Sequence, residues 1–186
     1  MDIVVNIELA GTLKEILSEQ KTEITCLTIT GQINAQDIRF IRDEMSNLKE
    51  LDIENVVIVE YFGKNGTSVE EDLCYAADTI PKYAFSKCKI LTFKLPKSIL
   101  SIEDYAFKHC GINRGYNEFG HYSFIIPNSV IDIGKEAFCN STNFWKLEIP
   151  ASVKSIGEGA FIGCYNVYVE KDSPYFICNP DTDWIF

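Results

Sequence analysis

The chain has 186 residues, 46% of them hydrophobic, and its 27 acidic and 17 basic side chains give a formal net charge of −10 at pH 7. The apolar content supports an ordered fold, while the acidic surface argues against nucleic acid and anionic membranes as partners. No apolar run reaches the roughly 18 to 20 residues that cross a bilayer, so we expect no membrane insertion.

The first 23 residues are expected to form an N-terminal cap. Within them, GTLKEILSEQ (11–20) places Leu13, Ile16 and Leu17 at the spacing of a short amphipathic helix. The start, MDIVVNIELAG, has neither the basic segment nor the long apolar core of a secretory signal. Two alternatives follow, a cytoplasmic chain or a mature fragment with an added methionine.

Residues 24–59 contain two strand-like segments, ITCLTIT and LKELDI, whose apolar positions match at a separation of 24 residues. Between them, residues 34–47 place Ile38, Ile41 and Met45 at helical spacing, with Asn34 as N-cap. Strand, helix and strand therefore fill the first repeats. Residues 60–79 are polar and acidic and are interpreted as a connecting loop.

Residues 80–170 repeat a shorter unit. An isoleucine is followed five residues later by an Ala-Phe pair in IPKYAF, IEDYAF, IGKEAF and IGEGAF, and three of the units carry a proline eleven residues before the phenylalanine. A fixed period of 20 to 30 residues indicates a solenoid, in which each unit buries its apolar face against its neighbours.

Before each proline, apolar residues alternate with others, as expected for a short strand with one face inward. The residues between them point outward and are candidate binding residues: Thr92 and Lys94, Ser123 and Ile125, Lys146 and Glu148. After the proline, a second short extended segment is expected. Gly134 and Gly157 then predict a turn with positive φ, and the phenylalanines of the Ala-Phe pairs predict an aromatic core stack.

Three of the seven cysteines, Cys88, Cys110 and Cys164, follow the Ala-Phe phenylalanine by three residues, and Ser141 takes this position in another unit. A thiol or hydroxyl at one recurring position suggests a small buried group that bonds weakly to the turn backbone. The close pairs of a zinc site are absent from the sequence. We therefore interpret these cysteines as structural, with disulfide pairing or metal binding as the alternative.

The repeat is interrupted at residues 111–121 by an insertion that contains GINRGYNEFGHY. Aromatic side chains together with Arg and Asn are typical of interface anchors. The candidate binding residues of this segment are Arg114, Tyr116, Asn117, Phe119 and His121. The alternative is that Tyr116 and Phe119 only hold the loop against the solenoid.

Catalysis is not expected. His109 and Cys110 are adjacent and resemble a general base and a nucleophile. The recurring position of the cysteine in the repeat explains its presence better. The segment NPDTD (179–183) has alternating oxygen side chains but lacks the glycine and glutamate of a calcium loop. We expect no cofactor and no metal. Residues 171–186 depart from the repeat and form either a C-terminal cap or a truncated repeat.

The strand-proline-glycine-Ala-Phe-Cys pattern, with units such as IPNSVIDIGKEAF and IPASVKSIGEGAF, resembles the BspA-type leucine-rich repeat proteins of Bacteroides-like bacteria over roughly residues 10–170. The resemblance implies one α/β domain: a right-handed leucine-rich repeat solenoid with short parallel strands, helical first repeats, and later repeats made mostly of strands and turns. It also implies an extracellular or cell-surface location and a non-enzymatic role in adhesion.

Two functions are therefore expected from the sequence. The first is a module that binds a protein or glycan, including host-derived ligands, through its strand face and the 111–121 insertion. The second is a structural spacer or assembly domain of a larger surface protein. The oligomeric state does not follow from the sequence.

Overall fold

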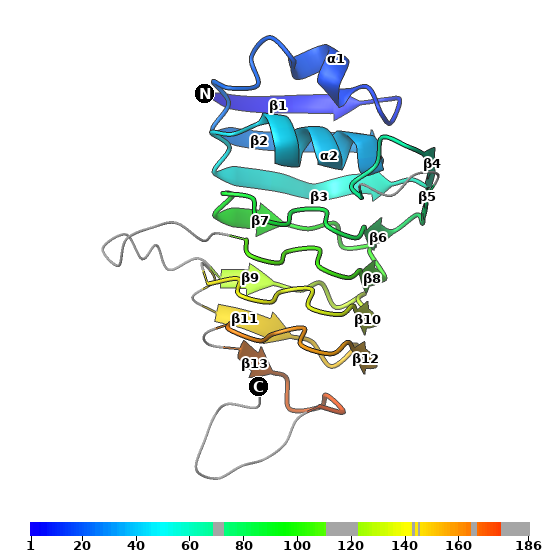
Figure 1. The fold of residues 1–186 in the computed structure, drawn as a ribbon, viewed down its shortest axis with the longest axis vertical. Helices are drawn as coiled ribbons and strands as arrows, with labels where there is room; N and C mark the ends of the chain where they lie inside the picture. The colour runs from blue at the N-terminus through cyan, green and yellow to red at the C-terminus, as the bar shows by residue number, and fades with distance from the viewer. Residues whose placement is uncertain (69–72, 111–122, 143, 145, 165–166, 176–186) are drawn as a thin grey trace, which may run out of the picture.

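The computed structural model describes residues 1–68, 73–110, 123–142, 144, 146–164 and 167–175. They form a parallel β-solenoid of about six turns, with its coils stacked along one axis from the N-terminus onward (Figure 1). The predicted solenoid with short parallel strands is confirmed.

One long side of the solenoid is a row of parallel strands. A four-stranded sheet runs in the order β1 (Asp2–Ile7), β2 (Cys26–Ile33), β3 (Glu50–Ile58) and β7 (Thr92–Lys94). A three-stranded sheet continues the row with β9 (Ser123–Ile125), β11 (Lys146–Ile149) and β13 (Val167–Val169). The two sheets adjoin between β7 and β9, where the rings of Phe93 and Phe124 lie 5.9 Å apart. We refer to both together as the long sheet.

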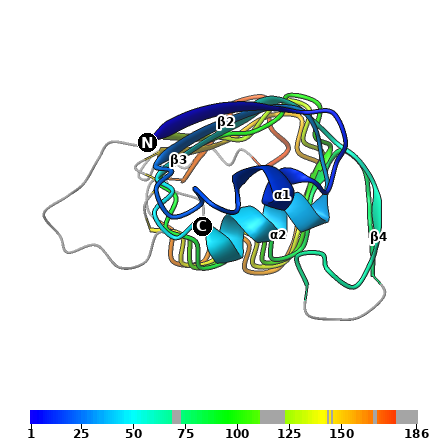
Figure 2. The same ribbon diagram turned by 90° about the horizontal axis from the view of Figure 1, so that it is seen from above.

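A second row consists of two-residue strands. It is formed by β6 (Thr79–Ile80), β8 (Ser101–Ile102), β10 (Asp132–Ile133) and β12 (Ser155–Ile156), all parallel. Three of them, β8, β10 and β12, follow the prolines of the repeat. The view along the solenoid axis shows the helices on the side opposite the long sheet, with the coils nearly superimposed (Figure 2). The extended segment predicted after each proline is therefore confirmed.

The N-terminal segment contains a strand that was not predicted from the sequence. Residues 2–7 form strand β1, which pairs in parallel with β2 from Asp2 opposite Cys26 to Ile7 opposite Gly31. Residues 1–23 therefore include a strand of the solenoid, and the predicted helix is the shorter α1 (Leu13–Leu17). The alternation of β1 is hard to detect in the sequence because Val4, an apolar residue, points outward and is 78% exposed.

The predicted helix of the first repeats is α2 (Ala35–Glu44), and Asn34 caps it by accepting a hydrogen bond from the Gln36 N–H. Asp37 joins α2 to the start of α1. Its buried carboxylate accepts hydrogen bonds from the backbone N–H groups of Gly11, Leu13 and Asn34 at 2.6, 2.9 and 3.0 Å. Burial raises the pKa of Asp37, and these three donors oppose that shift.

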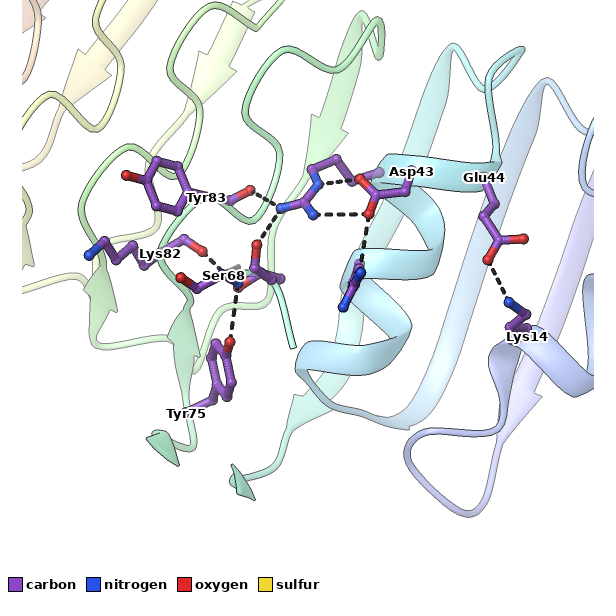
Figure 3. Close-up of polar contacts among 10 residues, drawn as sticks. Lys14, Asp43, Glu44, Ser68, Tyr75, Lys82 and Tyr83 are labelled. Carbon is purple, nitrogen blue, oxygen red and sulfur yellow. Dashed lines mark hydrogen bonds and ion pairs between the residues drawn. The ribbon is translucent and has the colours of Figure 1, made fainter. Parts of the chain in front are cut away.

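Residues 60–79, interpreted from the sequence as a loop, contain an antiparallel pair of strands, β4 (Tyr61–Gly63) and β5 (Leu73–Tyr75). The pair projects beside the solenoid (Figures 1 and 2). Arg42 of α2 fixes its base, because the guanidinium donates hydrogen bonds of 2.7 Å to the carbonyls of both Thr67 and Tyr83. Figure 3 shows Ser68, Tyr75, Lys82 and Tyr83 grouped near α2, with Asp43 facing them.

The phenylalanines of the four Ala-Phe pairs stack through the core as predicted. Successive ring centroids lie 5.4 Å apart for Phe85 and Phe107, 5.0 Å for Phe107 and Phe138, and 5.4 Å for Phe138 and Phe161. The backbone hydrogen bonds of this segment also run from coil to coil, for example from the Phe107 N–H to the Ala137 carbonyl at 2.7 Å.

The predicted positive φ of Gly134 and Gly157 is wrong, because neither is among the positive-φ glycines. These glycines instead allow close contact between coils. A Cβ on Gly134 would lie 2.4 Å from the Asp104 nitrogen, and one on Gly157 would lie 2.4 Å from the Lys135 nitrogen. In the turns around the Ala-Phe pairs, residues with positive φ stand two positions before and two positions after each phenylalanine: Tyr83, Tyr105, Glu136 and Gly159, then Lys87, His109, Asn140 and Gly163.

The structural interpretation of the recurring thiol position is supported by its contacts. Ser141 Oγ donates a hydrogen bond of 2.5 Å to the Phe107 carbonyl, and Cys164 Sγ donates one of 2.8 Å to the Phe138 carbonyl. Burial raises the pKa of Cys164 to about 12. The six described cysteines, Cys26, Cys74, Cys88, Cys110, Cys139 and Cys164, are free thiols.

Candidate binding face

The outward surface of the long sheet, which we call the sheet face, presents side chains in rows across the strands. One row follows the register Val4, Thr28, Asp52, Lys94, and another Ile125, Glu148, Tyr168. Because neighbouring strands lie about 4.8 Å apart and the backbone hydrogen bonds fix their register, the rows are rigid.

The structure places all six strand candidates on this face. Thr92 and Lys94 lie on β7, Ser123 and Ile125 on β9, and Lys146 and Glu148 on β11, and each is at least partly exposed. The residues between them, Phe93, Phe124 and Leu147, are buried. The inward and outward assignments made from the alternation are therefore confirmed for these three strands.

The charges of the sheet face are largely paired. Lys94 Nζ lies 2.7 Å from Asp52 Oδ2, and Lys97 Nζ lies 2.7 Å from Glu54 Oε1. The hydrogen bond to Asp52 raises the pKa of Lys94. On β11, Lys146 forms an ion pair with Glu148 and lies 5.4 Å from the ring centroid of Tyr168. These ion pairs therefore hold the charged side chains in place on the sheet face.

Between these paired charges, Ile125 stands out as an exposed apolar side chain. It is 64% exposed and lies beside Glu148 in the register. Val4 at 78% and Tyr168 at 37% add further apolar surface on the same sheet. The sequence reasoning missed Val4, Asp52 and Tyr168. The 24-residue match between ITCLTIT and LKELDI signals that Asp52 lies on the face, and the alternation of Val167 and Val169 around Tyr168 signals the same for β13.

The candidates of the insertion, Arg114, Tyr116, Asn117, Phe119 and His121, lie outside the described residues.

The His109 and Cys110 pair has no arrangement suited to nucleophilic catalysis. Cys110 is fully buried, burial raises the pKa of its thiol, and its sulfur faces the sulfur of Cys88. Because the nucleophilic form is the thiolate, this environment disfavours attack on a substrate. The described part of the chain contains no group of three or more His, Cys, Asp or Glu side chains placed to hold a metal ion.

A shallow pocket of about 490 Å³ lies beside α1 and α2. Its charged lining is already paired: Lys14 contacts Glu44 at 2.7 Å and Arg39 contacts Asp43 at 3.4 Å. Figure 3 shows the Lys14–Glu44 contact that joins the two helices. The sheet face is the stronger candidate for binding, because it also presents the exposed apolar side chain of Ile125, whereas Phe40 of the pocket lining is buried.

Comparison with protein families agrees with the repeat architecture. The model of the BspA type leucine rich repeat region (6 copies) matches residues 22–113 and 113–171. No curated protein matches the chain. No helix among the described residues is long and apolar enough to cross a membrane. The matched segments span most of the chain, and their repeats correspond to the coils of the solenoid; the chain belongs to the BspA-type leucine-rich repeat family.

Proposed function

We propose that the chain is a non-enzymatic binding module of a cell-surface protein, and that its sheet face contacts a protein or glycan partner in adhesion. Leucine-rich repeat solenoids are typically non-catalytic, and each coil adds one strand to a continuous extended surface. The family suggests a surface protein, which is consistent with a partner outside the cell.

The observation that carries this proposal is the exposure of Ile125 within a row of fixed polar side chains. An isoleucine that is 64% exposed on a short strand contributes little to the core. A partner that covers it would remove this apolar surface from water, which favours association. The paired charges beside it are already ordered, so binding would immobilise few additional side chains.

The test compares two isoleucines of equal exposure. Ile125 and Ile162 are both 64% exposed, but Ile162 lies in the turn after Phe161, away from the long sheet. The purified chain is screened against immobilised extracellular glycans and matrix proteins, and each ligand is titrated with the Ile125→Asp and Ile162→Asp variants. We expect Ile125→Asp to weaken binding at least tenfold, about 1.4 kcal/mol, while Ile162→Asp binds like the unmodified chain.

The free energy of unfolding serves as the control for both variants. Each substitution adds a charge at an exposed position, so we expect changes within about 0.5 kcal/mol. A ligand that binds the unmodified chain and both variants equally would exclude the sheet face around Ile125 as the contact surface. A chain that binds no ligand of the panel, and whose own copies associate, would instead support an assembly domain.

A further inference from the structure

Cys88 and Cys110 form the closest sulfur contact of the described cysteines. Their Sγ atoms lie 3.2 Å apart across two adjacent coils, and both side chains are buried. Each occupies the same position of its coil, three residues after Phe85 or Phe107, and each N–H donates to the carbonyl of that phenylalanine. The two thiols therefore face each other because the repeat places them there.

The surrounding backbone holds this pair in register. The Phe85 N–H donates to the Ala106 carbonyl at 2.7 Å, and the Lys87 N–H donates to the Lys108 carbonyl at 2.9 Å. The rings of Phe85 and Phe107 stack directly beside them. The two sulfurs therefore need to approach each other by only about 1 Å to reach the usual S–S length of ~2.05 Å.

At the equivalent positions of the next coils, the side chains form hydrogen bonds to backbone carbonyls. Ser141 and Cys164 donate to the carbonyls of Phe107 and Phe138 at 2.5 and 2.8 Å. Cys110 has only a weak contact of 4.0 Å with the Ile90 carbonyl besides the sulfur of Cys88. Ser141 also interrupts the column of thiols, so Cys164 has no cysteine at the equivalent position of the preceding coil.

We propose that Cys88 and Cys110 are a site of covalent modification, at which a low-molecular-weight disulfide such as glutathione disulfide oxidises the pair to a disulfide that links two coils. One cysteine thiolate attacks the reagent, forms a mixed disulfide and releases one glutathione thiolate. The second thiolate attacks the protein sulfur of that mixed disulfide and releases the other glutathione. Two protein thiols thus lose two electrons and two protons, and one glutathione disulfide becomes two glutathione thiols.

Access to the pair sets the rate of this reaction. Cys88 is 7% exposed and Cys110 is fully buried, so a reagent reaches them only when the coils open locally. Burial also raises the pKa of Cys110, which confines its thiolate to the open state. Reclosing of the coils then brings the two sulfurs together, which favours the internal disulfide over a lasting mixed disulfide.

The link has a measurable effect on stability. It would close a loop between residues 22 positions apart, which removes conformational freedom from the unfolded chain. We expect the unfolding equilibrium constant of the oxidised chain to fall about a hundredfold. The inference does not depend on the proposed binding face, since Ile125 and the thiol pair lie on different parts of the coil.

The experiment uses the full chain with Cys74→Ser, because Cys74 is exposed and would exchange with the reagent. The reduced protein is incubated with glutathione disulfide, without urea and at a urea concentration just below the unfolding midpoint, and is then digested under non-reducing conditions. We expect peptides that contain Cys88 and Cys110 to be linked, with a mass about 2 Da below the sum of the two reduced peptides. Urea should accelerate the reaction.

Two variants test the assignment. Cys164→Ser should still form the link, whereas Cys88→Ser should lose both the linked peptide and the oxidation-dependent rise in stability. Serine suits the position, as Ser141 shows. The proposal is overturned if the peptide map shows a pair other than Cys88 and Cys110, if stable mixed disulfides accumulate at both positions, or if no link forms in either urea condition.

Discussion

Phe107 lies at the centre of the aromatic stack. Its ring centroid is between 5.0 and 5.4 Å from those of Phe85, Phe93, Phe124 and Phe138. Two of these neighbours are stacked and two meet it edge to face, so the ring joins the phenylalanines of the Ala-Phe pairs to those of the long sheet. A side chain with such neighbours in two adjacent coils stabilises both coils at once.

We expect Phe107→Ala to lower the free energy of unfolding by about 3 to 5 kcal/mol, because the ring is fully buried and its removal leaves a cavity between coils. Urea unfolding followed by circular dichroism measures the effect. Phe62→Ala is the matched control, since that ring is 72% exposed and its loss should cost less than about 0.5 kcal/mol. Similar losses for the two variants would contradict the stack as a source of stability.

The role of a single residue could be predicted from the sequence where its position recurs in every repeat. It could not be predicted where the role depends on a contact with another coil. The inward phenylalanines and the thiol position follow from spacing alone. The role of Gly134 does not, because the Asp104 backbone that approaches it belongs to another coil. The positions with positive φ could not be predicted either, because residues as different as Tyr105, Glu136 and Asn140 occupy them.

Among the elements, the two helices are held together by a shared carboxylate. Glu44 at the end of α2 contacts Lys14 of α1 at 2.7 Å and Lys21 at 2.5 Å. Hydrogen bonds from these two lysines lower the pKa of Glu44 below its ordinary value of 4.5. The folded chain therefore favours the ionised carboxylate, and this contribution to stability is fully present above the ordinary value and lost as the pH falls through the lowered one.

We expect Glu44→Gln to lower the free energy of unfolding by about 0.5 to 1 kcal/mol at pH 7. The difference from the unmodified chain should shrink as the pH is lowered from 7 to 3, because the protonated carboxyl no longer forms the ion pairs. Urea titrations at several pH values measure it, with Glu15→Gln on the exposed surface of α1 as control. A difference that stays constant over this range would show that the lysine contacts do not stabilise the helices.

Elements with long periodic segments were predictable, and short ones were not. Helix α2 shows helical spacing and an N-cap residue, and β2 and β3 share a 24-residue match. Strands β4 and β5 have three residues each in a polar segment, too few to display a period. Their position depends on the contacts of Arg42 and Thr67 with other coils, which no local pattern encodes.

Across the whole molecule, charge is distributed unevenly along the solenoid axis. Residues 1–79 contain 16 acidic and six basic side chains, while residues 80–186 contain 11 of each. The entire net charge therefore belongs to the first part of the chain, whose coils include the helices, and repulsion among these acidic groups weakens with added salt. The later coils carry the thiol pair and Ile125, and their net charge is zero. Net charge repulsion therefore does not oppose their packing, and we expect their stability to depend on the contacts between coils.

The contact at Gly134 tests this dependence, since a solenoid is stabilised mainly by its nearest-neighbour interfaces. In Gly134→Ala the new methyl group would meet the backbone of Glu103 and Asp104 at 2.4 to 2.6 Å, and neither atom belongs to a flexible side chain. We expect a loss of about 1 to 3 kcal/mol from the separation of these two coils. Native-state hydrogen exchange should show lost protection in β8, β10 and β12, while β1, β2 and β3 keep theirs.

Asp132→Ala provides the control, because this exposed side chain lies two residues away in the same coil and should cost less than about 0.5 kcal/mol. A uniform loss of protection from β1 to β13 in Gly134→Ala would mean that the molecule unfolds as one cooperative unit. Protection lost only around the substitution means that the coils are energetically separable. In that case the sheet face keeps its geometry on one side of a local defect, and a ligand bound there is expected to stabilise only the coils that it contacts.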